Sequence, residues 1–273
     1  MQGAIITRIL LLVSMLMMVW SYSAQAGSRQ ELQVFHRYSS LNSGLSDWSD
    51  WTLSWRREQD ADNRYYLELN DIYHFDVRDQ KIALGYHHDS SATLQYQTEL
   101  TTSTAHSLYP SYSLYGGIET KLGQPLILNS GLRFSHYDKT NPVTMLNSTA
   151  DSLLFTGRLD YYSGNHLYSY SLYLTRMQGL TLADNALTHS IKYAYIYNDM
   201  NNIYLSYAQG DEIDFDPETD LGSSAIQSIT LGGMHWMNQR LAIVYTVARH
   251  NVSSTNFGYQ RNELYLGIRK LYG

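Results

Sequence analysis

The sequence predicts an all-β protein, a transmembrane antiparallel up-and-down β-barrel of about 14 strands, with 12 or 16 strands as alternatives. Three observations predict this fold. Apolar and polar residues alternate with period two through most of the chain, as they do in strands that have one apolar face. Beyond residue 26 there is no stretch of 18 apolar residues, which a membrane helix would need. The connections between the alternating segments are long and short in turn, as in outer-membrane barrels.

Residues 1–26 are predicted to be a secretory signal peptide that is cleaved after Ala26. Arg8 is the only charged side chain in this segment, residues 9–20 are almost wholly apolar, and the segment ends in Ala-Gln-Ala. A short basic start, an apolar stretch and small residues at the end are the features of such a peptide. An uncleaved anchor is the alternative. The expected domain is a single barrel over residues 27–273.

Composition excludes several classes of protein. The chain has no cysteine, which excludes disulfide frameworks, thiolate metal sites and cysteine nucleophiles. The formal net charge is −6, so we expect no nucleic-acid partner, because such a protein needs a basic face. The mean hydropathy of −0.34 resembles that of a soluble protein, yet half of every barrel strand faces water or the lumen. The 25 tyrosines suit the aromatic girdles at the two membrane interfaces.

Fourteen alternating segments are expected to be the strands, and each is long enough for a tilted membrane strand of about 9–11 residues or close to it. In chain order they are 31–38, 48–57, 63–74, 80–88, 91–101, 110–121, 127–137, 151–162, 166–177, 187–197, 203–209, 225–236, 240–249 and 259–272. The alternation is clearest in 91–101, where Leu94, Tyr96 and Leu100 interleave with polar residues. It is weakest in 80–88, 203–209 and 225–236.

The connections between these segments differ in length by parity. The odd ones are long, at 39–47, 75–79, 102–109, 138–150, 178–186, 210–224 and 250–258, with 75–79 the weak member. The even ones are short, at 58–62, 89–90, 122–126, 163–165, 198–202 and 237–239. Outer-membrane barrels have short periplasmic turns and long external loops. A secreted β-sandwich, soluble barrel or propeller, which is the competing fold, has no reason to sort its connections in this way.

Two stretches carry a family resemblance. Residues 159–168 (LDYYSGNHLY) with 172–176, and residues 205–212 (LSYAQGDE) with 216–219, resemble the YaiO-type outer-membrane barrel family. The likeness runs from about Leu32 to Tyr272. It implies an outer-membrane location and a single barrel, in a family without an established activity. In some relatives a similar barrel follows helical repeats or is associated with exopolysaccharide handling. Here we expect no such repeats, which weakens a role in polymer export.

The polar faces of the strands predict the inner wall. The lumen-facing candidates are Arg56, Tyr66, Glu68, Glu99, Tyr115, Glu119, Lys121, Arg133, Arg158, Asp160, Tyr162, Tyr173, Lys192, Arg261, Glu263 and Arg269. Their charges are close to balance, whereas a wide selective pore usually has a ring of one sign. Balance suggests paired charges that brace the wall, with a narrow or plugged passage. The inner tyrosines can stack on sugar rings.

Three other groups of residues are candidates for chemical sites. The acidic segment 210–220 could hold a cation through Asp211, Glu212, Asp214, Asp216, Glu218 and Asp220. It does not match the calcium-loop pattern, and a solvated loop is the alternative. His189 with Ser190, and His250 with Ser253, approach a nucleophile and base but show no third member. We therefore expect no catalytic residue, no metal site and no cofactor.

Three classes of function remain open. The first is a passage or channel for a small or linear solute, with a saccharide as one suitable class. The second is a non-transporting structural or surface barrel of the envelope, and the third is an outer-membrane lipid-modifying enzyme. The expected partners are outer-membrane lipid and lipopolysaccharide, and the barrel-assembly machinery, which would read the C-terminal strand 263–272. Lys270 and Gly273 depart from the usual form of that signal.

Overall fold

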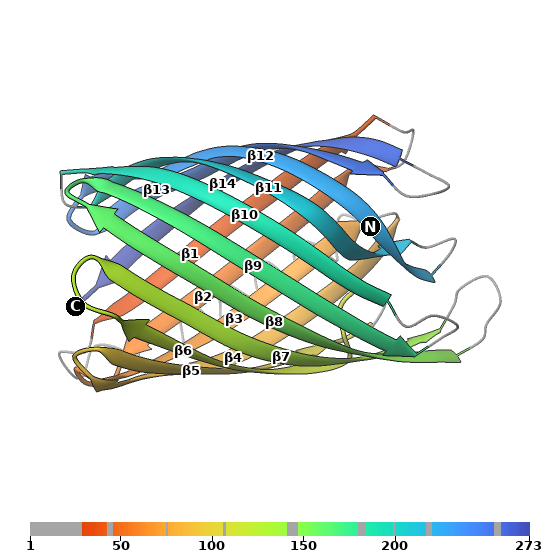
Figure 1. The fold of residues 1–273 in the computed structure, drawn as a ribbon, viewed down its shortest axis with the longest axis horizontal. Helices are drawn as coiled ribbons and strands as arrows, with labels where there is room; N and C mark the ends of the chain where they lie inside the picture. Colours follow the sequence, from red (N-terminus) through yellow and green to blue (C-terminus); the bar gives the residue numbers. More distant parts are fainter. Residues whose placement is uncertain are drawn as a thin grey trace, which may run out of the picture.

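The computed structural model of the chain is a closed barrel of fourteen antiparallel strands, each paired with its neighbours in sequence (Figure 1). Strand β14 pairs with β1 and closes the cylinder. The strands are β1 (Gln30–Leu41), β2 (Trp48–Glu58), β3 (Asn63–His74), β4 (Val77–Ser91), β5 (Leu94–Ser103), β6 (Tyr112–Lys121), β7 (Leu126–Thr140), β8 (Asn147–Ser163), β9 (His166–Gly179), β10 (Asp184–Tyr197), β11 (Asn201–Asp216), β12 (Asp220–Asn238), β13 (Leu241–Ser253) and β14 (Gly258–Tyr272). The predicted fold class and strand number are confirmed.

The structure describes most of the chain after the predicted signal peptide, which lies outside the described residues. It covers residues 29–42, 46–74, 76–105, 108–140, 147–179, 184–198, 200–216, 220–253 and 258–273. For residues 139–140, 147–148, 184, 212–216 and 220–223 it describes the backbone alone. No helix among the described residues is long and apolar enough to cross a membrane.

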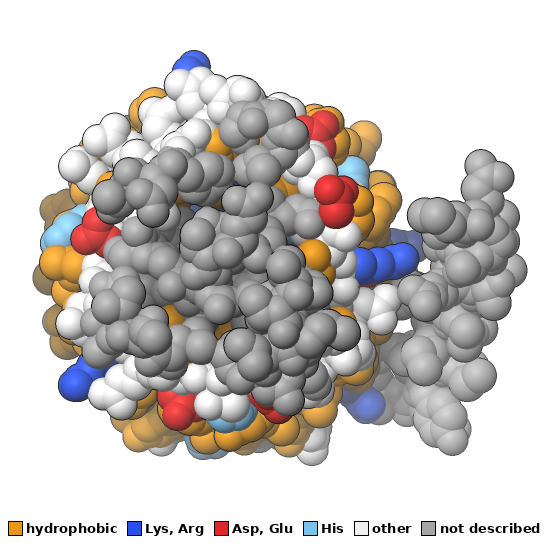
Figure 2. Space-filling model, turned by 90° about the vertical axis from the view of Figure 1, so that its right-hand side faces the viewer, with side chains coloured by type: hydrophobic (Ala, Val, Ile, Leu, Met, Phe, Trp, Pro, Cys, Tyr) orange, Lys and Arg blue, Asp and Glu red, His pale blue; other side chains and the backbone are white. Residues whose placement is uncertain are grey.

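The outer face of the barrel is apolar. Residues opposite each other on neighbouring strands point to the same face of the sheet. Once one residue is known to point outward, the strand register therefore identifies the outward residues of every other strand. Val34 lies opposite Leu53, which lies opposite Leu69, which lies opposite Ile82. Many outward side chains are large, apolar and exposed, such as Leu114 at 58%. Hydrophobic side chains lie along much of the visible rim of the barrel in an end view (Figure 2). An outer surface of this kind requires lipid around it.

Outward tyrosines lie near both ends of the strands. Tyr38, Tyr73 and Tyr112 lie near one end, and Tyr168 and Tyr195 near the other. The band between them is made mainly of leucine, isoleucine, valine and phenylalanine. Tyrosine suits the boundary because its ring is apolar and its hydroxyl needs a polar partner. This is the arrangement expected of two membrane interfaces with hydrocarbon between them.

The two ends of the barrel differ. The turn end carries the start of β1, the end of β14 and the connections 59–62, 92–93, 122–125, 164–165, 198–200 and 239–240. The loop end carries the connections 42–47, 75–76, 104–111, 141–146, 180–183, 217–219 and 254–257. In Figure 1 the C-terminus marks the turn end, at the left. In outer-membrane barrels the end with short turns faces the periplasm.

Several predicted boundaries were wrong because strand pairing continues past the segments in which the sequence alternates. Most of the expected loop 210–224 is a hairpin of β11 and β12, with Asp216 opposite Asp220. The connection at 75–76 is as short as any turn, and the turn expected at 89–90 lies at 92–93. Backbone groups that lie outside hydrocarbon can still form the hydrogen bonds of a β-ladder. When both faces of a strand contact water, its sequence need not alternate, so such strand ends cannot be predicted from alternation.

Candidate functional site in the barrel lumen

The inner face of the barrel is polar and charged. All sixteen predicted lumen-facing residues lie at inward positions of the register, for example Glu99 and Tyr115, which lie opposite each other on β5 and β6. The prediction missed other inward charges, namely Glu31, Arg37, Asp50, Arg64, Lys81, Asp79 and Asp89. All but Asp79 and Asp89 fall inside predicted strands at the inward parity, so alternation could have found them. Asp79 and Asp89 lie just beyond the predicted ends of β4.

Opposite charges on the inner wall are paired, both within a strand and between strands. The Arg133 guanidinium lies 2.8 Å from the Glu99 carboxylate, and the Tyr66 hydroxyl donates to the same carboxylate at 2.5 Å. Lys81 lies 3.6 Å from Glu68, and Arg158 lies 3.0 Å from Asp160. Pairing compensates charges that the wall partly removes from water. The charges therefore hold one another in place around the wall, as their near balance in sequence suggested.

A second polar network lies near the loop end. Asp50 pairs with Arg37 and accepts a hydrogen bond from His74 at 2.7 Å. Trp48 stacks on the His74 ring, with centroids 4.2 Å apart, and the Arg261 guanidinium lies 4.6 Å from the Trp48 ring. Trp48 also belongs to a buried cluster with Ile226, Val252 and Tyr259. This side of the lumen is thus filled with packed side chains.

The connection between β5 and β6 is fastened to the inner wall by Asp79. This buried carboxylate accepts hydrogen bonds from the backbone N–H groups of Ala105 at 3.1 Å, Leu108 at 3.0 Å and Tyr109 at 3.1 Å. The Tyr109 ring lies 5.0 Å from the Lys81 ammonium, which is itself paired inside the barrel. Burial, followed by the nearby Asp50 carboxylate, raises the pKa of the Tyr109 phenol above its usual value. Ala105, Leu108 and Tyr109 are therefore held against the inner wall at the loop end.

Inward glycines make room for inward tyrosines. Tyr66 lies opposite Gly85 on the next strand, and a methyl group at Gly85 would overlap the Tyr66 ring. Tyr204 covers Gly232 in the same way. A tyrosine that lies flat across a neighbouring glycine keeps its ring against the wall and its hydroxyl free to bond, here to Glu99 or Thr246. This packing sets the orientation of the rings that face the passage.

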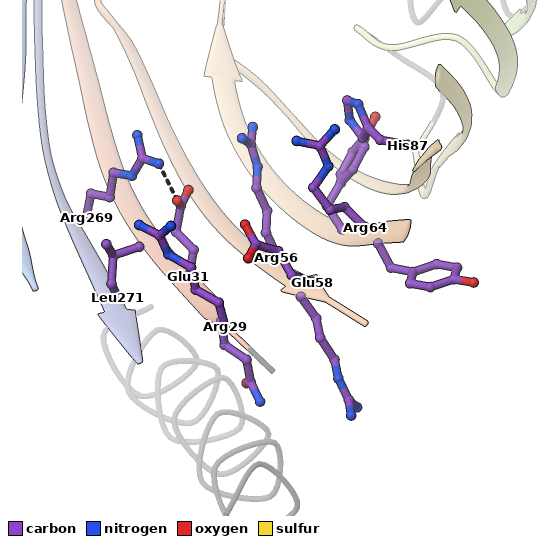
Figure 3. Close-up of a pocket in the computed structure, with 12 residues that line it drawn as sticks. Arg29, Glu31, Arg56, Glu58, Arg64, His87, Arg269 and Leu271 are labelled. Atoms are coloured by element: carbon purple, nitrogen blue, oxygen red, sulfur yellow. Dashed lines mark hydrogen bonds and ion pairs between the residues drawn. The ribbon is translucent and has the colours of Figure 1, made fainter. Parts of the chain in front are cut away.

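The turn end holds a cavity of about 210 Å³, shown in Figure 3. It lies between the starts of β1 and β3 and the ends of β2, β4 and β14. Its charged lining residues are Arg29, Glu31, Arg56, Arg57, Glu58, Arg64, His87 and Arg269. Arg56 and Arg269 were predicted from sequence to face the lumen.

The candidate chemical sites do not assemble. His189 faces outward, where its ring bonds the Tyr170 hydroxyl at 2.5 Å, whereas Ser190 faces inward. His250 bonds Ser228 at 2.7 Å rather than Ser253, and its other ring nitrogen lies 3.8 Å from Glu263. That distance is too long for the hydrogen bond that orients a catalytic base.

The acidic segment is not a loop of the expected kind. Its backbone belongs mostly to β11 and β12, and Asp211 is exposed. The side chains of the other five predicted cation ligands, Glu212, Asp214, Asp216, Glu218 and Asp220, lie outside the described residues. Among the described residues there is no group of three histidine, aspartate or glutamate side chains placed to hold a metal ion.

Comparison with protein families decides the relationship. Residues 29–215, about two thirds of the chain, match the family described as YaiO membrane beta barrel domain. The chain belongs to the YaiO membrane β-barrel family. The predicted resemblance is thereby confirmed, and membership with a porin-like fold implies an outer-membrane barrel. No curated protein matches this YaiO-family chain in sequence.

Solved structures share the architecture of this YaiO-family barrel. The CymD monoaromatic hydrocarbon channel aligns with a TM-score of 0.56 at 9% identity, covering 91% of this chain and 89% of that one. The anion-selective porin from Comamonas acidovorans aligns with a TM-score of 0.50 at 11% identity, covering 90% and 98%. The NanC porin aligns with a TM-score of 0.51 at 12% identity, covering 88% and 98%. At these identities the likeness shows a fold similar to porins and channels.

Proposed function

We propose that this barrel is a passage for small polar or linear solutes through the outer membrane. The observation that carries the proposal is the combination of an apolar outer face with an inner wall of paired charges, hydroxyls and tyrosines. Water and polar solutes can bind such a wall, because its side chains keep hydrogen-bonding atoms directed to the lumen. The similarity in fold to porins and channels supports the proposal.

The passage is narrow on this reading. The loop held by Asp79 narrows the lumen at the loop end, and the cluster around Trp48 fills the wall on another side. Barrels of eight strands are filled by side chains and those of 16 strands hold an aqueous channel, so 14 strands leave room for a restricted passage. Saccharides are a suitable solute class, because Tyr66 and Tyr115 offer ring faces beside carboxylate and guanidinium groups.

Single-channel recording tests the proposal. Refolded protein in a planar bilayer should give discrete conductance steps, and linear oligosaccharides in the bath should shorten or interrupt them. A barrel that seals the bilayer without any conductance would refute the passage role. It would favour the alternative, a structural or surface barrel of the envelope.

Four further proposals accompany this role. We propose that cleavage after Ala26 releases the mature barrel, and that the assembly machinery recognises β14. We also propose that lipid and lipopolysaccharide surround the barrel, and that it has no enzymatic activity. Sequencing the N-terminus of the mature protein tests the cleavage site. An assay for fatty acid released from lipopolysaccharide tests the expected lack of enzymatic activity, and we expect no release. Lys270 places its ammonium 4.9 Å from the Tyr272 ring, an arrangement suited to the headgroup region at the turn end.

A further inference from the structure

The cavity at the turn end is rich in arginine. Arg29 precedes β1, Arg56 and Arg57 lie near the end of β2, Arg64 lies near the start of β3, and Arg269 lies near the end of β14. The acidic side chains that line the same cavity are Glu31 and Glu58. The paired charges seen elsewhere on the inner wall are therefore replaced here by an excess of positive charge.

Part of this positive charge has an acidic partner and part has none. Arg269 pairs with Glu31, and Arg64 lies 2.6 Å from Asp89 on β4. Within the described part of the chain, neither Arg29 nor Arg56 has a carboxylate within 4.0 Å. Arg57 has none there either, but it lies at an outward position, opposite Tyr65. In Figure 3 the Arg56 and Arg64 side chains extend to the same side from neighbouring strands. His87 lies beside Tyr66, with ring centroids 5.5 Å apart, and lines the same space.

Converging guanidinium groups repel one another unless an anion lies between them. A guanidinium group presents a planar fork of N–H donors that matches the oxygens of a phosphate or carboxylate. The cavity adds the ring of Tyr66, which can pack against the carbon skeleton of such a ligand. Its volume of about 210 Å³ is sufficient for a compact multivalent oxyanion.

We propose that this cavity is a binding site for a phosphate- or carboxylate-bearing solute at the turn-end mouth of the barrel. The inference deepens the proposed passage role by naming the class of solute, and in that respect rests on it. Anion binding itself does not require conduction. The two ideas can therefore fail separately.

Pyrophosphate is the probe for the binding experiment. Isothermal titration of the refolded full-length mature barrel in zwitterionic detergent, at low ionic strength, should show saturable binding that weakens in 0.5 M salt, as screening requires. Arg56→Gln should weaken this binding on the order of tenfold, the effect of losing one charge-assisted hydrogen-bonding group. Arg29→Gln is a second variant in case the first fails to refold, and heat-modifiable mobility in detergent reports folding of both.

Arg240→Gln is the matched control. Arg240 is an exposed arginine in the 239–240 turn at the same end of the barrel, and it does not line the cavity. The control should bind pyrophosphate as the wild type does. Absence of saturable binding to wild-type protein, or equal loss in the Arg56 and Arg240 variants, would overturn the proposal.

Two further measurements separate the source of the anion and the role of conduction. In nanodiscs of zwitterionic lipid the wild type should bind pyrophosphate, and anionic phospholipid should leave this binding in place. Abolition of binding by anionic phospholipid would assign the site to a lipid headgroup instead of a solute. Retained binding in a barrel without conductance would refute the passage role alone. Conductance without pyrophosphate binding would refute the anion site alone.

Discussion

Replacement of Asp79 by asparagine should release the loop that narrows the barrel. One carboxylate oxygen accepts the N–H groups of Gln80 at 2.8 Å and Ala105 at 3.1 Å, and the other accepts those of Leu108 and Tyr109. In Asp79→Asn one of these oxygens becomes an NH₂ group that faces two N–H donors. If the NH₂ group faces Leu108 and Tyr109, two loop donors lose their acceptor. If it faces Gln80 and Ala105, one loop donor does, because Gln80 belongs to β4; the cost is about 1–3 kcal/mol per donor.

This cost is large compared with the balance between a docked and a released loop. About 1.4 kcal/mol changes an equilibrium tenfold, so the loss of a single loop donor at about 1 kcal/mol already shifts the loop toward the released state about fivefold. Single-channel recordings of Asp79→Asn should therefore show larger conductance steps, more rapid fluctuation, or both. Limited proteolysis at the loop 104–111 should be faster than in the wild type.

Asp71→Asn is the control for this experiment. Asp71 lies near the same end of the barrel but faces outward, where it pairs with Arg78. Its replacement should leave conductance and proteolysis unchanged. If Asp79→Asn refolds to a heat-modifiable barrel with wild-type conductance and wild-type proteolysis of the loop, the loop is not held in the way described.

Four other outcomes are expected. Because the pKa of the Tyr109 phenol is raised, docking of the loop should be fully retained below pH 10 and should weaken as the pH rises further. Conductance should therefore increase at alkaline pH, and Tyr109→Phe should remove this pH dependence. Gly85→Ala should displace the Tyr66 ring from Glu99 and lower the urea midpoint of unfolding, whereas Gly116→Ala, where a methyl group meets nothing within 4 Å, should not. Glu99→Gln should weaken the pairing with Arg133 and raise anion over cation permeability, measured as a shifted reversal potential in a salt gradient, and unchanged selectivity would contradict the assignment. Wild-type protein and Ser228→Ala should give the same result in a lipid-hydrolysis assay. The reason is that His250 lies too far from Glu263 to act as an oriented base for Ser228.

Much of the fold followed from the period of the sequence, because lipid and lumen impose opposite demands on neighbouring residues. The alternation around Leu94, Tyr96 and Leu100 placed these side chains outside and Glu99 inside, and the register agrees. Alternation predicts less where that opposition ends. The run of carboxylates from Asp211 to Asp216 predicts a loop, but the backbone of these residues pairs with β12 as a strand.

The contacts among inward side chains were harder to predict than which residues point inward. Alternation identifies Arg56 and Arg269 as inward residues, yet it does not indicate that Arg29 and Arg64 line the same cavity, because their proximity depends on closure of the barrel. The inward fold of the loop 104–111 was also missed. It depends on a single carboxylate, Asp79, that lies one residue outside the predicted strand. Contacts between distant strands and single capping residues leave no periodic signal.

The junction of the first and last strands has a consequence for assembly. Arg269 pairs with Glu31 across it, and Ser39 donates to Glu263 at 3.5 Å, so the charges that join β14 to β1 come from opposite ends of the chain. Until both strands are present, two edges with unpaired backbone groups would face hydrocarbon. A chain that stops before β14 should accordingly be rejected as a whole by the membrane, and damage at this junction should appear first as missing protein in the envelope.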